Sequence, residues 1–262
     1  IMKNKKILYK KKIKNPYFSI ITVVKNDEQN IDKTIKSIKN QKFKNFEYII
    51  IDGSSSDQTI QNILRYKKIV NLLITEKDNG IYYAMNKGAR IASGEIVLFV
   101  NSGDEITKNA LNIIKKKFKK KNIDFVFGTV RRHYNKGTIL KHGFDKKKLK
   151  NNFDFATSHS TGFFIKRSTF KSLNYFNTKY RCSADYDLYY RLIITKKKHG
   201  NYTPKNQLIG IVQSGGFSSK LSFIQHLIEE VKIRLDNKQN KFIVLIIIIN
   251  ALIKHLFKKI FK

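Results

Sequence analysis

Short apolar runs alternate along the first half of the chain with longer segments in which apolar residues recur at helical spacing. Four runs are rich in β-branched and aromatic residues and are bounded by Gly, Ser and Asp: Tyr17–Val24, Tyr48–Ile51, Leu72–Thr75 and Ile96–Val100. Such runs predict parallel strands that are covered on both faces. Three segments with helical spacing lie between them: residues 31–40, 59–66 and 81–92. This order predicts a Rossmann-like, mostly parallel sheet with right-handed crossovers and flanking helices.

The second half of the chain has a less regular pattern. We expect helices over Ala110–Lys121 and Ser183–Leu192, and an apolar helical face over residues 221–235. Further β-rich segments are Phe125–Thr129, Val130–Tyr134, Thr138–His142 and Gly162–Lys166. We therefore predict an α/β domain at residues 16–219, with a loose basic tail at residues 1–15 and an amphipathic helical extension at residues 220–262.

The chain is strongly basic, and two interpretations of this charge remain open. Lys and Arg number 53 against 19 Asp and Glu among 262 residues, a formal net charge of +34. The excess either points to an anionic partner or reflects compositional drift towards lysine on solvated faces. The single cysteine, Cys182, excludes an internal disulfide and fits a reducing compartment.

No segment reaches the ~20 apolar residues that a membrane-spanning helix needs. The first apolar run is a core strand, so we expect no signal peptide. The apolar segment Phe242–Ile253 is too short to cross a bilayer, and a cluster of lysines follows it. Such a segment suits shallow insertion into an anionic membrane surface, whereas a core-docked or dimer-forming helix is the alternative.

Polar residues follow two of the predicted strands directly. Asp52–Asp57 comes after the second strand, and Asn101–Asp104 comes after the fourth. In open α/β sheets, ligands bind at the carboxyl ends of the strands. Carboxylates at this edge can hold a sugar nucleotide and its divalent metal, so the pattern favours an enzyme.

The ordered set of these motifs resembles the family 2 glycosyltransferases of GT-A fold, particularly bacterial members that build surface polysaccharides. The segments that carry the resemblance are Phe18–Asn26, Ser37–Gln41, Glu47–Asp57, Glu76–Tyr82, Ala84–Gly88 and Asn101–Asp104. A looser resemblance continues through Ala184–Leu188 to Gly215–Ser218. It implies that residues 16–105 bind the nucleotide sugar and that residues 106–219 bind the acceptor.

The resemblance also implies a donor site along the strand ends. Asp52 would contact the nucleobase or ribose, Asp78 would be the second acid, and Gly80 would allow a tight turn. The residues assigned to donor binding are Thr22, Val24, Asp52, Asp78, Gly80, Asn86, Lys87, Asn101 and Ser102. Ordinary loop or turn carboxylates are the alternative for Asp52 and Asp78, and Asp57 is expected to be a helix cap.

Asn101–Asp104 occupies the place of the family's metal motif but departs from its usual pair of acids. Asn101 and Gly103 stand where many relatives have carboxylates, which leaves Asp104 as the expected ligand of Mg²⁺ or Mn²⁺. Mg²⁺ tolerates one or two carboxylates when substrate phosphates and water supply the remaining ligands. We expect weak metal binding in the absence of donor.

The resemblance places the catalytic base at Asp185. Removal of a proton from an acceptor hydroxyl requires one carboxylate that faces the sugar. Asp187 is the alternative, but two positions further along a helix it points to a different face. His159 either lines the acceptor cleft or is a structural histidine.

These expectations combine into one functional hypothesis. The chain is expected to be an inverting, metal-dependent glycosyltransferase that moves a sugar from a nucleoside diphosphate donor to a glycan or lipid-linked hydroxyl. It would act in the cytoplasm at the inner face of the membrane, as a monomer or a homodimer. A basic nucleic-acid-binding protein and another nucleotide-binding transferase are the alternatives, although acidic strand ends would repel nucleic acid.

Overall fold

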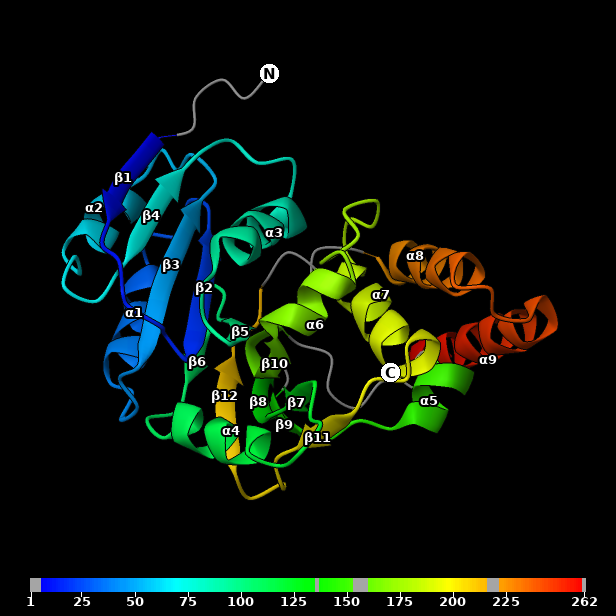
Figure 1. Cartoon of the computed structure of the whole chain (residues 1–262). Helices are drawn as coiled ribbons and strands as arrows, with labels where there is room; N and C mark the ends of the chain where they lie inside the picture. The colour runs from blue at the N-terminus through cyan, green and yellow to red at the C-terminus, as the bar shows by residue number, and fades with distance from the viewer. Residues whose placement is uncertain (1–5, 135–136, 153–159, 216–221, 261–262) are drawn as a thin grey trace.

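The computed structural model describes residues 6–134, 137–152, 160–215 and 222–260, and of residues 258–260 only the backbone (Figure 1). Its strands are β1 (Lys6–Lys10), β2 (Phe18–Val24), β3 (Phe46–Asp52), β4 (Leu72–Thr75), β5 (Ile96–Phe99), β6 (Glu105–Ile106), β7 (Phe125–Phe127), β8 (Thr129–Tyr134), β9 (Gly137–Lys141), β10 (Phe163–Lys166), β11 (Gly200–Tyr202) and β12 (Leu208–Val212). Its α-helices are α1 (Ile31–Lys39), α2 (Thr59–Leu64), α3 (Ile81–Ile91), α4 (Ala110–Phe118), α5 (Lys146–Asn151), α6 (Arg167–Ser172), α7 (Ala184–Tyr190), α8 (Phe223–Asp236) and α9 (Lys241–Ile260).

The large sheet confirms the predicted mostly parallel α/β architecture. Its strand order within the described residues is β1-β4-β3-β2-β5-β10-β7-β11, and β2 to β5 run parallel to one another. At their carboxyl ends, Val24 pairs in register with Asp52, and Asp52 with Thr75. This row brings the residues that follow β2, β3 and β4 to one edge of the sheet.

Two apolar cores lie on opposite faces of this sheet, as expected for strands that are apolar throughout. One core joins α1, α2 and α4 to alternate strand residues such as Ile20, Ile50 and Leu98. The other joins α3, α6 and α7 to the intervening residues, such as Ile21, Ile51 and Phe99. All of these strand residues are at most 1% exposed, so the sheet is a rigid support for the loops at its edge.

The structure differs from the sequence-based expectation at the chain start. Residues 6–10, expected to belong to a loose tail, form strand β1, which pairs antiparallel with β4. The lysines in β1 masked its alternating pattern, because an edge strand with solvent-facing charges is less apolar than a central one. A second sheet has the strand order β6-β12-β8-β9, and the sequence predicted only β8 and β9 of it.

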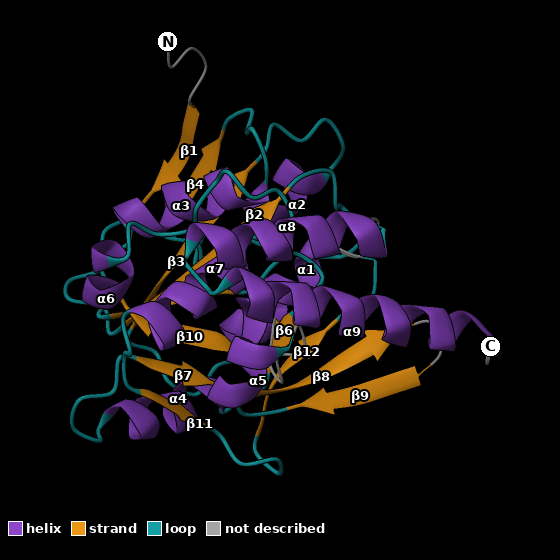
Figure 2. Ribbon diagram, turned by 90° about the vertical axis from the view of Figure 1, so that its right-hand side faces the viewer, coloured by secondary structure: helices purple, strands orange, loops and turns teal. Residues whose placement is uncertain are grey.

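Helix α8 contacts α7 on one side and α9 on the other, so α9 lies at the end of the molecule away from β1 to β4 (Figure 1 and Figure 2). A capping box formed by Ser222 and Gln225 begins α8, and Ile233 of α8 is buried in the same core as α7. Arg234, 0% exposed, donates to the carbonyls of Leu149 and Lys150 at the end of α5. The predicted extension is therefore joined to the α/β domain through α8. No helix among the described residues is long and apolar enough to cross a membrane.

Candidate active site

Asp52, the last residue of β3, is fully buried at the carboxyl edge of the sheet. Its Oδ2 accepts hydrogen bonds from the Ser55 N–H at 3.0 Å and the Thr75 hydroxyl at 2.6 Å, and its Oδ1 accepts one from the Ser55 hydroxyl at 2.5 Å. The carboxylate is thus oriented by groups that follow β3 and end β4. Asp57 accepts hydrogen bonds from the Thr59 and Glu28 N–H groups and so acts as the expected local cap.

Thr22 and Val24 lie on β2 beside this carboxylate, but the Thr22 side chain is used internally. Its hydroxyl donates to the carbonyl of Val100 at 2.7 Å and accepts from the Tyr48 hydroxyl at 2.9 Å, and the residue is 0% exposed. The Thr22 hydroxyl thus links β2 to β3 and to the end of β5, and the donor contact expected of Thr22 stays a prediction. Val24, 7% exposed, packs next to Asp52 in register.

Asp78 follows β4 and pairs with Lys87 of α3. The Lys87 ammonium lies 2.7 Å from Asp78 Oδ1 and 3.2 Å from Glu76 Oε2. Burial raises the pKa of Asp78, although Lys87 opposes this effect. Asp78 Oδ2 is buried with no hydrogen-bond partner among the described residues. Gly80 begins α3 at φ +132°, a conformation that residues with a Cβ rarely adopt.

Asn86 lies on α3 and binds the backbone of a distant segment. Its amide donates to the Phe176 carbonyl at 2.8 Å and accepts from the Phe176 N–H at 3.0 Å, and the residue is 3% exposed. Both ends of the amide therefore help to fix the segment before α7, and the donor contact expected of Asn86 stays a prediction. The sequence placed Asn86 on the correct helix but could not reveal the distant backbone that it binds.

The Asn101–Asp104 loop after β5 is held by Thr34 of α1. The Thr34 hydroxyl donates towards the Asp104 carbonyl at 2.7 Å and accepts from the Gly103 N–H at 3.0 Å. Gly103 adopts φ +88°, so a carboxylate-bearing residue at this position would be strained. The departure from the family's paired acids thus coincides with a turn that favours glycine.

Asp104 is 5% exposed, and each of its carboxylate oxygens has a protein donor. The Thr161 hydroxyl donates to Oδ2 at 2.5 Å, and the Gln213 N–H donates to Oδ1 at 3.0 Å. Burial raises the pKa of Asp104 to about 7, despite these hydrogen bonds. The carboxylate is consequently anchored to the loop after β12 as well as to the turn before β10.

The oxygens of this loop fit a hard divalent cation. Asn101 Oδ1 and Ser102 Oγ are buried without hydrogen-bond partners among the described residues, and they share the turn with Asp104. A carboxylate offers about four lone-pair sites, so the two hydrogen bonds named above do not by themselves fill those of Asp104. The described residues contain no cluster of three His, Cys, Asp or Glu side chains that could hold a metal alone. A cation here would need ligands from substrate and water.

Asp185 lies in the first turn of α7, with one carboxylate oxygen fixed and the other open. Oδ1 accepts from the Tyr82 hydroxyl at 3.1 Å and from the Tyr186 N–H at 2.9 Å. No described residue donates a hydrogen bond to Oδ2. Burial raises the pKa of Asp185, while these two hydrogen bonds and the charge of His226 oppose the rise. Such an arrangement leaves one oxygen that can accept a hydrogen bond from an incoming hydroxyl.

Asp187 has a different environment from Asp185. Its Oδ2 accepts from Arg191 Nε at 2.8 Å, Asn237 donates to its Oδ1 at 3.3 Å, and its side chain is 2% exposed. Arg191 in turn donates to the carbonyls of Leu173 and Tyr175. These contacts make Asp187 part of a buried structural ion pair.

Glu229 of α8 holds the segment Arg181–Ser183, which we call the base strap because it leads directly into Asp185. Its carboxylate accepts hydrogen bonds from the three backbone N–H groups of the strap at 2.7 to 2.9 Å. The Cys182 thiol also donates to Glu229, at 3.0 Å. Burial, together with the nearby Glu229, raises the pKa of Cys182 to about 12, so this thiol has no nucleophilic role near neutral pH.

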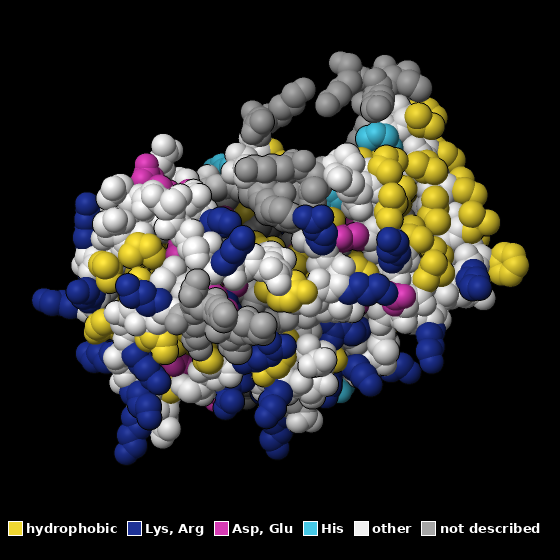
Figure 3. All heavy atoms as spheres, turned by 90° about the horizontal axis from the view of Figure 1, so that it is seen from above, with side chains coloured by type: hydrophobic (Ala, Val, Ile, Leu, Met, Phe, Trp, Pro, Cys, Tyr) yellow, Lys and Arg dark blue, Asp and Glu magenta, His cyan; other side chains and the backbone are white. Residues whose placement is uncertain are grey.

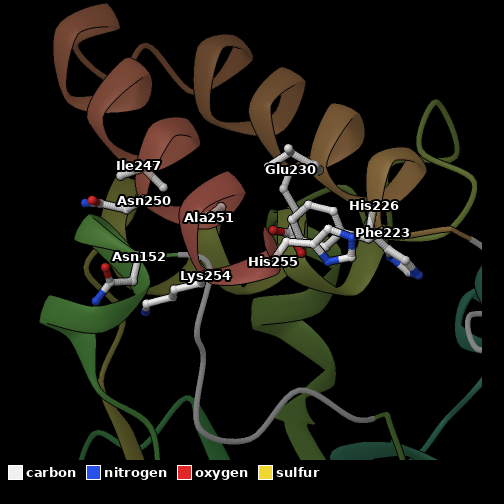
Figure 4. A pocket seen from close by; sticks show the side chains of 10 residues that line it. Asn152, Phe223, His226, Glu230, Ile247, Asn250, Ala251, Lys254 and His255 are labelled. Carbon is white, nitrogen blue, oxygen red and sulfur yellow. The ribbon is translucent and has the colours of Figure 1, made fainter. Parts of the chain in front are cut away.

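A cavity of about 280 Å³ lies between α8 and α9, close to the end of α5 (Figure 4). His226 and Glu230 line it from α8, and Lys254 and His255 line it from α9. The His255 ring stacks on Phe223 with centroids 4.1 Å apart. His226, which lines this cavity, also lowers the pKa of Asp185 through its charge.

Residues 19–180 match the family model described as glycosyl transferase family 2. The chain belongs to this family. A curated relative from Campylobacter jejuni, the GalNAc(5)-diNAcBac-PP-undecaprenol beta-1,3-glucosyltransferase, is 37% identical over 109 residues. That match covers 39% of this chain and 34% of the relative, so it spans about a third of the relative's length.

Two solved structures of glycosyltransferases show that the GT-A fold is shared. S. aureus TarS 1-349 in complex with UDP-GlcNAc matches with a TM-score of 0.67 at 19% identity, over 90% of this chain and 71% of that TarS chain. The mannosyltransferase PcManGT of Pyrobaculum calidifontis, in complex with GDP-Man and Mn²⁺, matches with a TM-score of 0.64 at 16% identity, over 91% of this chain and 69% of PcManGT.

Four residues that complete the site were not found from the sequence: Thr34, Tyr82, Thr161 and Glu229. Tyr82 and Asn86 are four positions apart on α3, and both contact the segment before α7. Their spacing alone could have predicted that they lie on the same face of the helix. The others reach the site from distant parts of the chain. Two predictions, His159 and most of the loop Gly215–Ser218, lie outside the described residues.

Proposed function

We propose that this protein is an inverting glycosyltransferase that transfers a sugar from a nucleoside diphosphate to a hydroxyl of a lipid-linked glycan, in surface polysaccharide synthesis. The observation that carries the proposal is the environment of the Asp185 carboxylate. One of its oxygens is fixed by two donors, the other is open, and burial raises its pKa. Family membership supplies the reaction class, and the acidic strand ends supply a site for the donor.

The reaction that fits these residues is a single displacement. The acceptor oxygen forms a bond to the anomeric carbon while its proton passes to Asp185 Oδ2. The bond from that carbon to the diphosphate breaks, and the bonding electron pair leaves with the diphosphate. One carboxylate on the acceptor side, without a second to form a covalent intermediate, gives inversion.

The donor half would position the nucleotide. Asp52 is oriented at the strand edge to accept hydrogen bonds from the nucleobase or the ribose hydroxyls. Asp78 and Lys87 form the neighbouring ion pair, and Lys87 is close enough to rearrange towards a phosphate. Asp104, with Asn101 and Ser102, would hold Mg²⁺ or Mn²⁺. When bound, the cation neutralises charge on the departing diphosphate.

The acceptor would reach Asp185 from the side of the cavity between α8 and α9. That cavity mixes apolar residues with amides and cationic groups, as suits a sugar next to an anionic linkage. The C. jejuni relative is named for an undecaprenol diphosphate acceptor, and this supports a lipid-linked acceptor here.

Helix α9 supports a location at the membrane surface. Hydrophobic side chains gather over the C-terminal helices at the right of Figure 3. Nine large apolar residues of α9 are exposed by 36 to 77%: Phe242, Ile243, Leu245, Ile246, Ile249, Leu252, Ile253, Leu256 and Phe257. An apolar patch of this extent marks an interaction site. The basic net charge favours an anionic lipid surface over a second copy of the chain.

Thermal shift measurements with UDP, GDP and other nucleoside diphosphates, each with and without Mn²⁺, test the donor assignment. Binding to the folded state at a hundredfold excess over Kd adds about 2.7 kcal/mol to the free energy of unfolding. We expect one nucleotide to raise the melting temperature, and to raise it further with Mn²⁺. The absence of a response to every nucleotide, together with salt-sensitive RNA binding, would favour the nucleic-acid alternative.

A further inference from the structure

The Tyr82 hydroxyl lies between two acceptors that it cannot serve at the same time. It is 3.1 Å from Asp185 Oδ1 and 3.1 Å from the carbonyl oxygen of Cys182. A tyrosine hydroxyl carries one hydrogen, so it donates to one of them at a time. Burial and the neighbouring Asp185 charge raise the pKa of Tyr82 well above its usual value, which keeps the hydrogen in place.

We propose that Tyr82 is a positioning residue for the base, whose hydroxyl hydrogen turns from Asp185 to the Cys182 carbonyl when Asp185 takes up the acceptor proton. This inference rests on the proposed function, in which Asp185 is the base. Tyr82 would donate to Asp185 while that carboxyl is ionised, and to the Cys182 carbonyl once the carboxyl is protonated.

The direction of the turn follows from acceptor strength. A hydrogen bond to an ionised carboxylate is roughly twice as strong as one between neutral groups, so Tyr82 donates to ionised Asp185. Once Asp185 is neutral this advantage disappears. The amide oxygen of Cys182 is then the stronger acceptor, because resonance with nitrogen places more negative charge on it than on a carboxylic acid carbonyl.

Both acceptors and the tyrosine ring are held in place, so the hydroxyl can turn without movement of the backbone. Glu229 binds the N–H groups of the base strap and thereby fixes the Cys182 carbonyl. The Tyr82 ring packs against Phe176 with centroids 5.2 Å apart, and Asn86 fixes the Phe176 backbone. Tyr82 itself is 8% exposed.

Other titratable groups also face this carboxyl, and the test must keep them constant. His226 of α8 lowers the pKa of Asp185. The charge of Asp185 raises the pKa of Tyr189 on α7. Glu229 contacts the base strap at Cys182. Tyr82→Phe leaves all three in place and keeps the aromatic ring, so it removes only the hydroxyl.

The first measurement is the titration of Asp185 in the full chain by ¹³C NMR of labelled aspartate carboxyls, which needs no substrate. The Asp185 signal is assigned by its loss in Asp185→Asn. We expect Tyr82→Phe to move the midpoint to higher pH by roughly one unit, the effect of one lost hydrogen bond to a charged group. The matched control is Tyr83→Phe, which removes the hydroxyl of the neighbouring, 43% exposed tyrosine and should leave the midpoint unchanged.

The second measurement uses the single cysteine of the chain, because a ¹³C label in the cysteine carbonyl gives one signal. In the wild type this signal should shift with the same midpoint as Asp185, and in Tyr82→Phe the shift should be largely lost. A flat carbonyl signal in the wild type, or an unchanged Asp185 midpoint in Tyr82→Phe, overturns the inference.

Failure of this inference is distinguishable from failure of the proposed function. If Asp185→Asn transfers sugar at the wild-type rate, Asp185 is not the base and both proposals fail. If Asp185→Asn is inactive, but Asp185 titrates with the same midpoint in Tyr82→Phe as in the wild type, only the role of Tyr82 is rejected.

Discussion

The hydroxyl of Thr161 donates to Asp104 Oδ2 at 2.5 Å, although 57 positions separate the two residues in the chain. Asp104 belongs to the loop after β5, and Thr161 belongs to the turn that leads into β10. This contact joins the expected metal ligand to the half of the domain that would bind the acceptor. The position of Asp104 therefore depends on both parts of the domain.

Asp104→Asn should abolish metal-dependent transfer while the fold is retained. Its amide oxygen can still accept from the Gln213 N–H, and its NH₂ group can donate to the Thr161 hydroxyl, which is free to rotate. The substitution removes the charge of the carboxylate that is expected to bind the cation. Isothermal titration of Mn²⁺ in the presence of nucleoside diphosphate, together with a transfer assay, checks this. Near-normal transfer by the variant would reject the metal assignment.

The raised pKa of Asp104 predicts a pH dependence of stability in the metal-free protein. In the folded protein the Asp104 carboxyl has a pKa of about 7, against an ordinary value of 3.8. Between these values the folded state holds more protons than the unfolded state, so the free energy of unfolding falls as pH rises through this window. Urea unfolding of the wild type and Asp104→Asn at pH 5 and pH 8 in EDTA measures the difference. The variant should lose less stability between the two pH values, and equal losses would contradict the prediction.

Asp185→Asn should keep donor binding and lose transfer by roughly 10²–10⁴-fold, the range usual for general acid–base groups. Its matched control is Asp187→Asn, two positions away on the same helix. Asp187 is paired with Arg191 and 2% exposed, so its neutralisation should lower the melting temperature without removing the chemistry. Nucleotide binding, transfer rate and melting temperature, measured on both variants, separate the two roles. Greater loss of transfer in folded Asp187→Asn would reverse the assignment.

The sequence predicted the parallel core of the fold well, because strands β2 to β5 are buried on both faces and read as continuous apolar runs. β1 was missed, since an edge strand such as Lys6–Lys10 carries exposed lysines. The carboxylates at the strand ends were also found, because their position follows from the strand order. Direct contacts over long separations were not predictable: Thr161 with Asp104, Asn86 with Phe176, and Glu229 with Cys182.

Glu229→Gln should make Cys182 more reactive. The wild-type thiol is 7% exposed and its pKa is raised to about 12, so it should react slowly with a thiol reagent at pH 8. The neutral amide of glutamine no longer opposes thiolate formation, and it holds the three N–H groups of the base strap less firmly. Glu230→Gln, which removes the same charge from the next position of α8, is the control. Equal reaction rates in Glu229→Gln and the wild type would show that Glu229 does not hold the strap.

The exposed apolar surface of α9 predicts reversible binding to anionic membranes. Shallow insertion of this surface is favourable, and each lysine near anionic headgroups adds on the order of 1 kcal/mol. The full chain should sediment with anionic vesicles at low salt and much less with neutral vesicles. A chain truncated after Asn240 should stay in the supernatant and still bind donor. The truncation leaves α8 and its contacts with the base strap intact.

A point variant makes this membrane test sharper. Ile246→Asp places a charge on α9 at a residue that is 57% exposed, so the fold should tolerate it while vesicle binding weakens. Ile139→Asp is the matched control, because Ile139 is 50% exposed on β9 and does not belong to the α9 surface. If Ile246→Asp loses vesicle binding and Ile139→Asp keeps it, the result supports insertion of α9 into the membrane. If the full chain stays in the supernatant and elutes as a dimer that Ile246→Asp dissociates, then α9 binds a second copy of the chain and not the membrane.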